Sequence, residues 1–245
     1  MLGALGVAAA AVMLFVPPIT HAPASHPFAD QRRMLGIPNL LDVISNLPFA
    51  VVGVLGLLFV GRRKEAFTGS WERAAFAVMF AGMGLTALGS TCYHLAPDNA
   101  TLFWDRVPMT IVFMSLFAIV IGDRIGWDAG RRLLLPLLAA GIASVVYWRW
   151  TGDLRFYGLV QYFPMLAILL MVLLRPRMYT GTVWLAGAMC WYALAKIFEM
   201  LDAQIFALGQ VVSGHTLKHL AAGAASWWLL RMMKVRRAVE FVASD

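Results

Sequence analysis

The sequence predicts an all-α integral membrane protein: a seven-transmembrane helix bundle with an additional N-terminal hydrophobic segment. Of its 245 residues, 61% are hydrophobic and 13% are charged, whereas a soluble domain is about half apolar and a quarter charged. The mean hydropathy is +0.74. The apolar residues form runs near the ~20 residues that a helix needs to cross a bilayer, and the alternating pattern of a membrane β-barrel is absent.

The first apolar segment, residues 2–19, ends at Pro17 and Pro18 and is followed by the small residues around Ala22 and Ala24. This pattern is typical of a signal peptide with its cleavage region, but the positively charged start of such a peptide is missing. Both a cleaved signal and a retained helix fit the segment. Either one places residues 20–39 on the same side of the membrane.

Seven further apolar segments follow, and charged or turn-forming residues separate them. They are residues 40–61, 74–95, 104–122, 133–150, 156–174, 178–201 and 204–230. No polar insert of domain size interrupts them, so they form one unit. The expected organisation is a hydrophobic segment at 1–20, an extracytoplasmic segment at 21–39, a seven-helix core at 40–233 and a tail at 234–245.

The basic residues predict the orientation, because short cytoplasmic loops are enriched in Lys and Arg. Thirteen of them fall on one side: Arg62, Arg63, Lys64, Arg73, Arg124, Arg131, Arg132, Arg175, Arg177, Arg231, Lys234, Arg236 and Arg237. Five fall on the other: Arg32, Arg33, Arg106, Arg149 and Arg155. We therefore expect a cytoplasmic C-terminus. The net charge of +7 lies in loops and forms no basic stripe, so no nucleic-acid partner is expected.

Three of the five histidines lie in or beside the spanning segments, at one depth near the extracytoplasmic side: His94, His215 and His219. Ionisable residues in such segments usually mark a site. His215 and His219 are four residues apart and share a helix face, an arrangement that suits two ligands of one metal. Two free cysteines inside apolar segments, Cys92 and Cys190, offer neither a disulfide framework nor a thiolate zinc site.

Three neutral imidazoles with an open fourth position are the pattern of a catalytic zinc site, where bound water has a pKa near ~7. Asp105 begins the next segment at the same depth, and Ser90 precedes His94 by one turn. Asp105 is then a candidate general base or partner of a ligand, and Ser90 a candidate donor to the water or to a developing oxyanion. The alternative is that the histidines are hydrogen-bonded packing residues.

A second polar group, Lys196, Glu199 and Asp202, follows roughly one stripe of its segment. We interpret it as an internal ion pair rather than a substrate contact. Lys218, which lies between two of the histidines, is expected to point away from the ligand face.

These motifs resemble the signature regions of the alkaline ceramidase family, within the CREST superfamily of seven-transmembrane hydrolases that includes the adiponectin receptors. The resemblance covers about residues 28–230. It is carried by Ser90 to His94, by Trp104 to Met109 and by Ser213 to His219 in the family's order and spacing, and Asn39 to Asn46 looks like the start of the family's first core helix.

The resemblance implies that His94, His215 and His219 bind Zn²⁺ and that Ser90 and Asp105 assist the metal-bound water. It implies a long-chain lipid amide such as ceramide as the substrate. Relatives can also bind Ca²⁺ through an acidic N-terminal stretch. Here Ser25 to Asn39 offers only Asp30 as a carboxylate, with Asp42 just beyond, which puts calcium in doubt.

The functional expectation is a multi-pass membrane hydrolase that uses zinc to cleave an N-acyl lipid to a fatty acid and an amine, with its active site toward the extracytoplasmic leaflet. Its partners are the lipid amide and membrane lipids. The alternative is a zinc-containing receptor or lipid-sensing protein without significant turnover. The sequence leaves the headgroup, the acyl length and the oligomeric state open.

Overall fold

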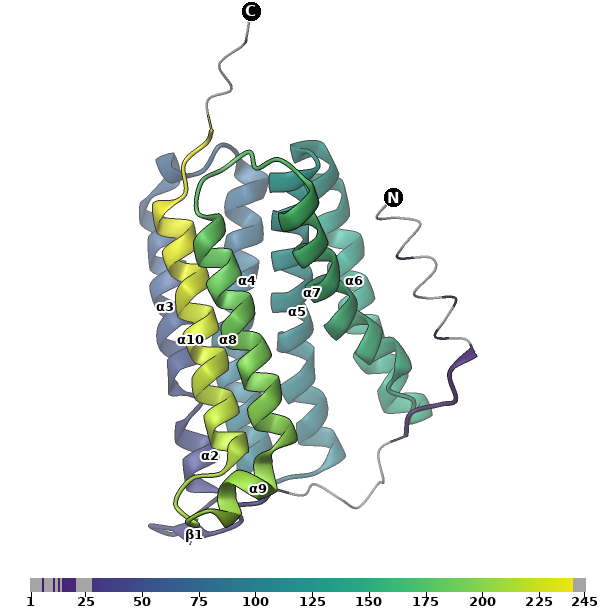
Figure 1. The fold of residues 1–245 in the computed structure, drawn as a ribbon, viewed down its shortest axis with the longest axis vertical. Helices are drawn as coiled ribbons and strands as arrows, with labels where there is room; N and C mark the ends of the chain where they lie inside the picture. Colours follow the sequence, from purple (N-terminus) through teal and green to yellow (C-terminus); the bar gives the residue numbers. More distant parts are fainter. Residues whose placement is uncertain (1–5, 7–10, 12, 14, 21–27, 240–245) are drawn as a thin grey trace, which may run out of the picture.

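A computed structural model describes residues 6, 11, 13, 15–20 and 28–239 of the chain. Long helices run side by side in alternating directions, and one short β-hairpin lies at an end of the bundle (Figure 1). The helices are α2 (Leu40–Ile44), α3 (Leu47–Arg62), α4 (Ser70–Leu95), α5 (Asn99–Arg124), α6 (Trp127–Thr151), α7 (Arg155–Leu174), α8 (Thr182–Met200), α9 (Asp202–Ala207) and α10 (Gly214–Val235), with a 3₁₀ turn at Lys64–Ala66.

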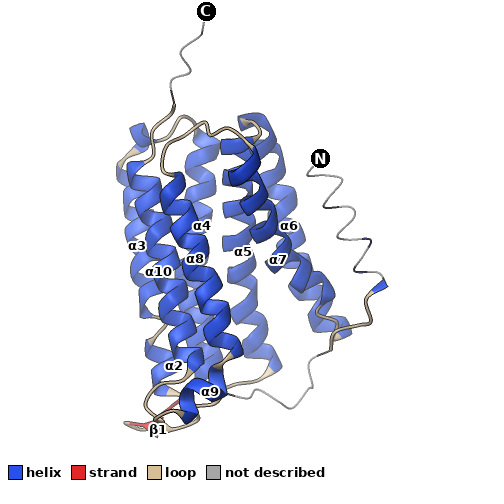
Figure 2. Ribbon diagram, in the orientation of Figure 1, coloured by secondary structure: helices blue, strands red, loops and turns tan. Residues whose placement is uncertain are grey.

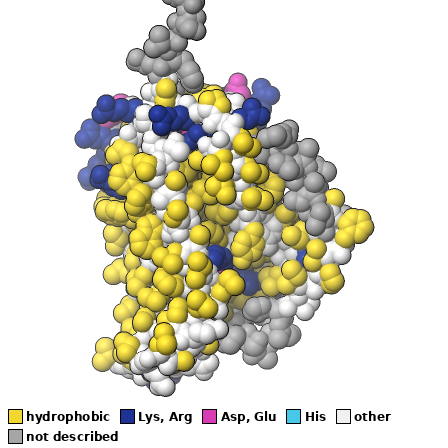
Figure 3. Space-filling model, in the orientation of Figure 1, with side chains coloured by type: hydrophobic (Ala, Val, Ile, Leu, Met, Phe, Trp, Pro, Cys, Tyr) yellow, Lys and Arg dark blue, Asp and Glu magenta, His cyan; other side chains and the backbone are white. Residues whose placement is uncertain are grey.

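Within the described residues, six helical stretches are long and apolar enough to cross a membrane. They are Leu40–Arg62, which joins α2 and α3, and the helices α4, α5, α6, α7 and α8. Strand is confined to the hairpin of β1 (Arg33–Met34) and β2 (Ile37–Pro38) within the described part of the chain (Figure 2). Figure 3 shows a flank covered by apolar side chains. The chain is therefore an all-α, multi-pass membrane bundle.

The two ends of the bundle differ in charge. Lys and Arg side chains gather where α3 ends and α4 begins, at the top of Figure 3, and we name this the basic end. The opposite end carries the hairpin, α2 and α9, and we name it the histidine end because α4 ends there at His94 and α10 begins there beside His215. The residues expected on opposite sides of the membrane therefore separate to opposite ends.

The expected single segment 40–61 is wrong in one respect, because it divides into α2 and α3 at Ser45 and Asn46. Both side chains turn back to the carbonyl of Asp42, which accepts from Ser45 Oγ at 2.9 Å and from Asn46 Nδ2 at 2.9 Å. Pro48 then occupies the first turn of α3, where its missing N–H leaves no helical bond unmade. The break turns the polar side chains of α2 into the bundle.

The last expected segment, 204–230, is also divided. It comprises α9, a connection at residues 208–213 and α10, which extends to Val235. Gln210 in the connection has a left-handed backbone with φ of 53°. Ser213 then caps α10, its Oγ accepting from Thr216 N at 3.0 Å. The other expected segments each match one helix, with ends displaced by a few residues.

The expected N-terminal segment at 2–19 lies largely outside the described residues. Its described end packs beside the turn between α6 and α7. Val16 O accepts from Arg155 Nη1 at 2.6 Å, and Ile19 O accepts from Leu154 N at 2.8 Å. These bonds tie the end of the segment to the bundle.

Helix α4 lies in the middle of the packing and contacts both α3 and α5, while α10 packs along α8 and α3. The largest fully buried side chains come from α4 and include Phe76, Met79, Phe80 and Met83. These side chains lie nearer the basic end than the histidines do. A cavity and the histidines lie closer to the histidine end.

Candidate metal centre

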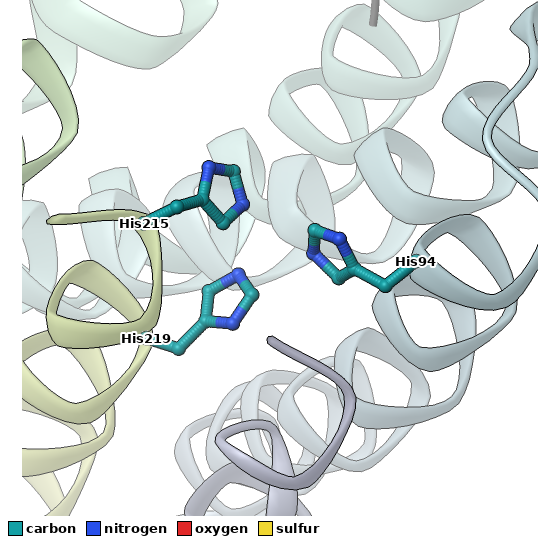
Figure 4. Close-up of side chains that lie close together, drawn as sticks. All are labelled: His94, His215 and His219. Atoms are coloured by element: carbon teal, nitrogen blue, oxygen red, sulfur yellow. The ribbon is translucent and has the colours of Figure 1, made fainter. Parts of the chain in front are cut away.

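The histidines of α4 and α10 converge at the histidine end (Figure 4). The ring centroid of His94 lies 4.9 Å from that of His215 and 5.0 Å from that of His219, and the last two are 4.8 Å apart. One ring nitrogen of each residue lies within 4.8 Å of the other two. The cluster can hold a metal ion.

The start of α10 is fixed so that its two histidines face α4. Asp202 Oδ1 accepts from the backbone N–H of His215 at 2.7 Å, which satisfies a donor that the helix itself leaves open. Gly214 allows this contact, because a Cβ there would lie 2.2 Å from the carbonyl oxygen of Phe198 and 2.6 Å from Asp202 Cα. The close approach of α8 and α10 therefore positions His215.

The ring of His219 is oriented by α2. Its Nδ1 lies 2.8 Å from Ser45 Oγ and 3.2 Å from the carbonyl oxygen of Asp42. Because a carbonyl only accepts, Nδ1 carries the proton in this arrangement and Nε2 keeps its lone pair. A metal-binding histidine commonly donates its other nitrogen to such an oxygen.

The two other rings have buried nitrogens without partners. His94 Nδ1 and His215 Nε2 are buried, and neither has a hydrogen-bond partner among the described residues. Buried polar atoms are nearly always hydrogen-bonded, so such orphans need an explanation. A divalent metal at His215 Nε2 would account for that orphan and would use the lone pair of His219, and the donor set of three imidazoles suits zinc. The residues therefore fit this metal.

Sequence reasoning missed the contribution of α2 to this centre. Asn39 Nδ2 donates to the carbonyl of His94 at 2.9 Å, and Thr216 Oγ1 donates to Asp42 Oδ1 at 2.6 Å. Together with Ser45, these contacts join α2 to both helices that carry histidines. A signal was present, because Asn39, Asp42 and Ser45 recur at intervals of three in an otherwise apolar segment and so share a helix face.

Asp105 and Ser90 meet across the contact between α5 and α4, where the carboxyl of Asp105 interacts with the hydroxyl of Ser90. Gly89 permits this, because a Cβ there would lie 2.2 Å from the carbonyl oxygen of Trp104. Ser90 is buried. The group of described residues that can ligate a metal contains the three histidines without Asp105, so the carboxyl is available for another role.

Phe28 covers the centre at the histidine end. Its ring centroid lies 4.7 Å from that of His94 and 5.0 Å from that of His215, and its side chain is buried. Ala29 N donates to Asp202 Oδ2 at 3.0 Å. The same carboxylate therefore holds both the covering segment and the start of α10.

Asp30, the carboxylate in the stretch where relatives bind calcium, is paired with Arg32. Arg32 Nε donates to its Oδ1 at 2.8 Å and Arg32 Nη2 to its Oδ2 at 2.7 Å. This guanidinium lowers the pKa of the Asp30 carboxyl below its ordinary value. Arg32 also donates to the carbonyls of Gln210 and Val211, at 2.6 and 2.9 Å. Arg32 therefore holds the Asp30 carboxylate and joins the segment to the loop before α10.

The expected ion pair of Lys196 and Glu199 is present, with Lys196 Nζ 2.5 Å from Glu199 Oε2. Two contacts around this pair differ from a single stripe on one helix. Asp202 bonds to backbone N–H groups, as described, because it lies beyond the end of α8. Lys218 of α10 joins the pair, since its Nζ lies 3.1 Å from Glu199 Oε1, and a carboxylate is a better partner for a cation than apolar surroundings.

An apolar cavity of about 110 Å³ lies on the basic side of the histidines. Its wall includes Phe49, Met83, Met109, Phe113, Tyr192 and Ala222. Ala222 follows His219 by three residues, and Met109 follows Asp105 by four. Because such spacings keep a helix face, the cavity begins about one turn from the metal centre.

No family model and no curated protein matches the chain. The interpretation of the site therefore rests on its geometry and on the motifs in the sequence.

Proposed function

We propose that the chain is a zinc-dependent membrane amidohydrolase that cleaves the amide of an N-acyl lipid to a fatty acid and an amine. The observation that carries the proposal is the junction of two features. Three imidazoles, two of which have a buried nitrogen without a hydrogen-bond partner among the described residues, converge at one end of an apolar cavity inside a membrane bundle. A metal supplies hydrolytic chemistry, and the cavity supplies a place for an acyl chain.

The proposal includes the topology that the sequence predicts. Helix α10 is the seventh span, supported by its 22 residues and its packing along α8 and α3. The basic end faces the cytoplasm, and the histidine end faces the outer leaflet. Residues 2–19 form the additional hydrophobic segment.

Zinc held by His94, His215 and His219 supplies Lewis-acid activation of a water and of the amide carbonyl. Ser45 and the carbonyl of Asp42 hold the His219 ring in the tautomer that leaves Nε2 free. The acyl chain lies in the apolar cavity, so the amide is presented one helical turn away, beside the histidines.

Asp105 moves the proton. Its carboxylate accepts a proton from the attacking water as the new C–O bond forms, and it returns that proton to the amide nitrogen as the C–N bond breaks. Ser90 interacts with the Asp105 carboxyl and orients it for both steps. The products are a fatty acid in the cavity and an amine at the histidine end, and the remaining acid proton can pass to the amine to give a carboxylate and an ammonium ion.

The test uses purified protein in lipid nanodiscs, with metal content measured by mass spectrometry and released fatty acid measured after incubation with a mixed lipid extract. We expect about one zinc per chain, lost in His94→Ala and His215→Ala. Asp105→Asn should keep the zinc and lose turnover by about 10²-fold or more. Zinc that is retained in both histidine variants contradicts the site.

The receptor or lipid sensor without turnover is the other outcome. It would bind zinc through the same histidines, lose thermal stability on chelation and release no fatty acid from any amide. The comparison of the wild type with Asp105→Asn therefore separates the two functions, because only a hydrolase changes its product yield while its metal content stays constant.

A further inference from the structure

Three basic side chains surround the histidine end of the apolar cavity. Arg106 lies three residues before Met109 on α5, and Lys218 lies four residues before Ala222 on α10. Lys196 lies four residues after Tyr192 on α8. Met109, Ala222 and Tyr192 all line the cavity. Because these spacings keep a helix face, each cation lies about one turn outward of the cavity wall.

Arg106 is held by aromatic rings. Its guanidinium carbon lies 4.2 Å from the ring centre of Trp148 and 4.9 Å from that of Tyr157. Nη1 is buried and has no hydrogen-bond partner among the described residues. A cation in a membrane bundle is costly and usually marks a function. The free N–H groups point to an acceptor that the chain itself does not provide.

The two lysines share one carboxylate. Lys196 and Lys218 each contact a different oxygen of Glu199, so two positive charges face one negative charge. Their side chains are 23% and 20% exposed, which leaves part of each ammonium group accessible. The two lysines are therefore partly accessible from outside the bundle.

Carboxylates as well as cations gather at this rim. Asp105 interacts electrostatically with Arg106, Lys218 and Glu199, and Asp42 interacts with Lys218 and Asp202. The lysines therefore have carboxylates near them, whereas Nη1 of Arg106 is a buried cationic donor without a hydrogen-bond partner among the described residues. Such a donor favours an anionic acceptor, because charge-assisted hydrogen bonds are the stronger ones.

We propose that this rim binds an anionic group on the amine portion of the lipid amide, with Arg106 as the residue that selects it. The inference rests on the proposed function, because it names the substrate class of the same site. The preferred substrates are lipid amides whose headgroup carries a carboxylate or a phosphate, such as N-acyl amino acids. A neutral headgroup would offer Nη1 of Arg106 only a hydroxyl oxygen, which is a weaker acceptor than an anionic oxygen. Lys196 and Lys218, which are partly exposed at the rim, assist by attracting the anionic headgroup toward the site.

The test compares three substrates with one acyl chain: N-oleoylglycine with a carboxylate, N-oleoylethanolamine without charge, and its phosphate monoester. Zinc-loaded protein in nanodiscs of neutral lipid is assayed for kcat/KM on each. We expect the wild type to favour at least one anionic substrate about tenfold or more over the neutral one, since charge-assisted hydrogen bonds are the stronger ones. The two anionic arms distinguish carboxylate from phosphate.

Arg106→Gln should reduce this preference about tenfold, mainly through KM, whereas Arg106→Lys should keep part of it. Arg149→Gln is the matched control, because Arg149 is an exposed arginine near the same end of the bundle, and its preference should equal that of the wild type. If Arg106→Gln does not fold, Lys196→Gln replaces it. Equal turnover of charged and neutral substrates by the wild type overturns the inference and leaves the proposed hydrolase standing.

A binding measurement separates the two proposals. Zinc-loaded Asp105→Asn in nanodiscs is titrated with N-oleoylglycine and N-oleoylethanolamine. If the anionic lipid binds preferentially and Arg106→Gln abolishes that preference, the proposal that the rim selects an anionic group is supported. If the same binding is seen while no substrate is hydrolysed, only the proposed hydrolase activity is overturned. Equal binding of the two lipids overturns the proposal that the rim selects an anionic headgroup.

Discussion

The ring of Phe28 lies 4.7 Å from the ring of His94 and covers the metal-binding cluster at the histidine end. Phe28 comes from a segment that precedes every described helix of the bundle, and no local pattern in the sequence connects it to His94 some 66 residues later. Its position means that the cluster is shielded from water on this side by one side chain.

Replacing Phe28 by alanine should open the centre to small molecules. We expect zinc content to stay near the wild-type value while the rate of zinc loss to a hydrophilic chelator rises severalfold. Phe28→Leu should behave like the wild type, because it keeps an apolar cover. Phe59→Ala, a change to an aromatic residue of α3 that packs against Phe67, is the control. An unchanged rate of zinc loss in Phe28→Ala would show that Phe28 does not limit access.

Ser45 should set the metal affinity through His219. Ser45→Ala removes the contact of 2.8 Å to Nδ1, and loss of such a partner typically costs about 10–100-fold in metal affinity. The measurement is competition with a chelator of known zinc affinity. Ser144→Ala is the control, because that buried serine bonds within α6 to Gly141. Equal affinities of the two variants would contradict the role given to Ser45.

Gly89 should be needed for the contact between α4 and α5. Gly89→Ala places a Cβ 2.2 Å from the carbonyl oxygen of Trp104, and overpacking of this kind costs about 1–3 kcal/mol. We expect a lower Tm and, because Asp105 moves with α5, lower turnover. Gly84→Ala on the same helix meets no atom within 4 Å and should keep both quantities. A normal Tm for Gly89→Ala would rule out the close approach.

Asp30 should make the stability depend on pH. Arg32 lowers the folded-state pKa of Asp30, so the pair contributes its full stability above the unfolded-state pKa of about 4 and loses it as the pH falls through the lower, folded-state pKa. Asp30→Asn should therefore lower the Tm of metal-free protein at pH 6, and the difference from the wild type should shrink toward pH 2. A difference that stays constant with pH would exclude this contribution.

The membrane bundle could be predicted from the sequence because long apolar runs have few alternatives in lipid. The division of 40–61 could not, since the hydropathy of Ser45 and Asn46 is outweighed by that of their neighbours. Their side chains bond to the carbonyl of Asp42, and such bonds replace helical ones without any change in average composition. The break is nevertheless what turns Ser45 toward His219.

The three histidines of the site could be placed together because residue spacing fixes a helix face and segment order fixes depth. The direction of Lys218 could not be predicted, since its partner Glu199 comes from another helix. Arg106 shows the same limit, because its contacts with Trp148 and Tyr157 join three helices. The zinc chemistry, the hydrolysis and the orientation in the membrane stay predictions until the experiments above are done.

Asp202 links the segment at Ala29 to the start of α10, so that a displacement of one affects the other. One of its oxygens accepts from Ala29 and the other from His215. Because a single carboxylate cannot follow two parts that move apart, a force on the segment at Ala29 is transmitted to the first turn of α10 or breaks one of the two bonds. A molecule that pulls on this segment would thereby displace His215, one of the three clustered histidines, without touching it.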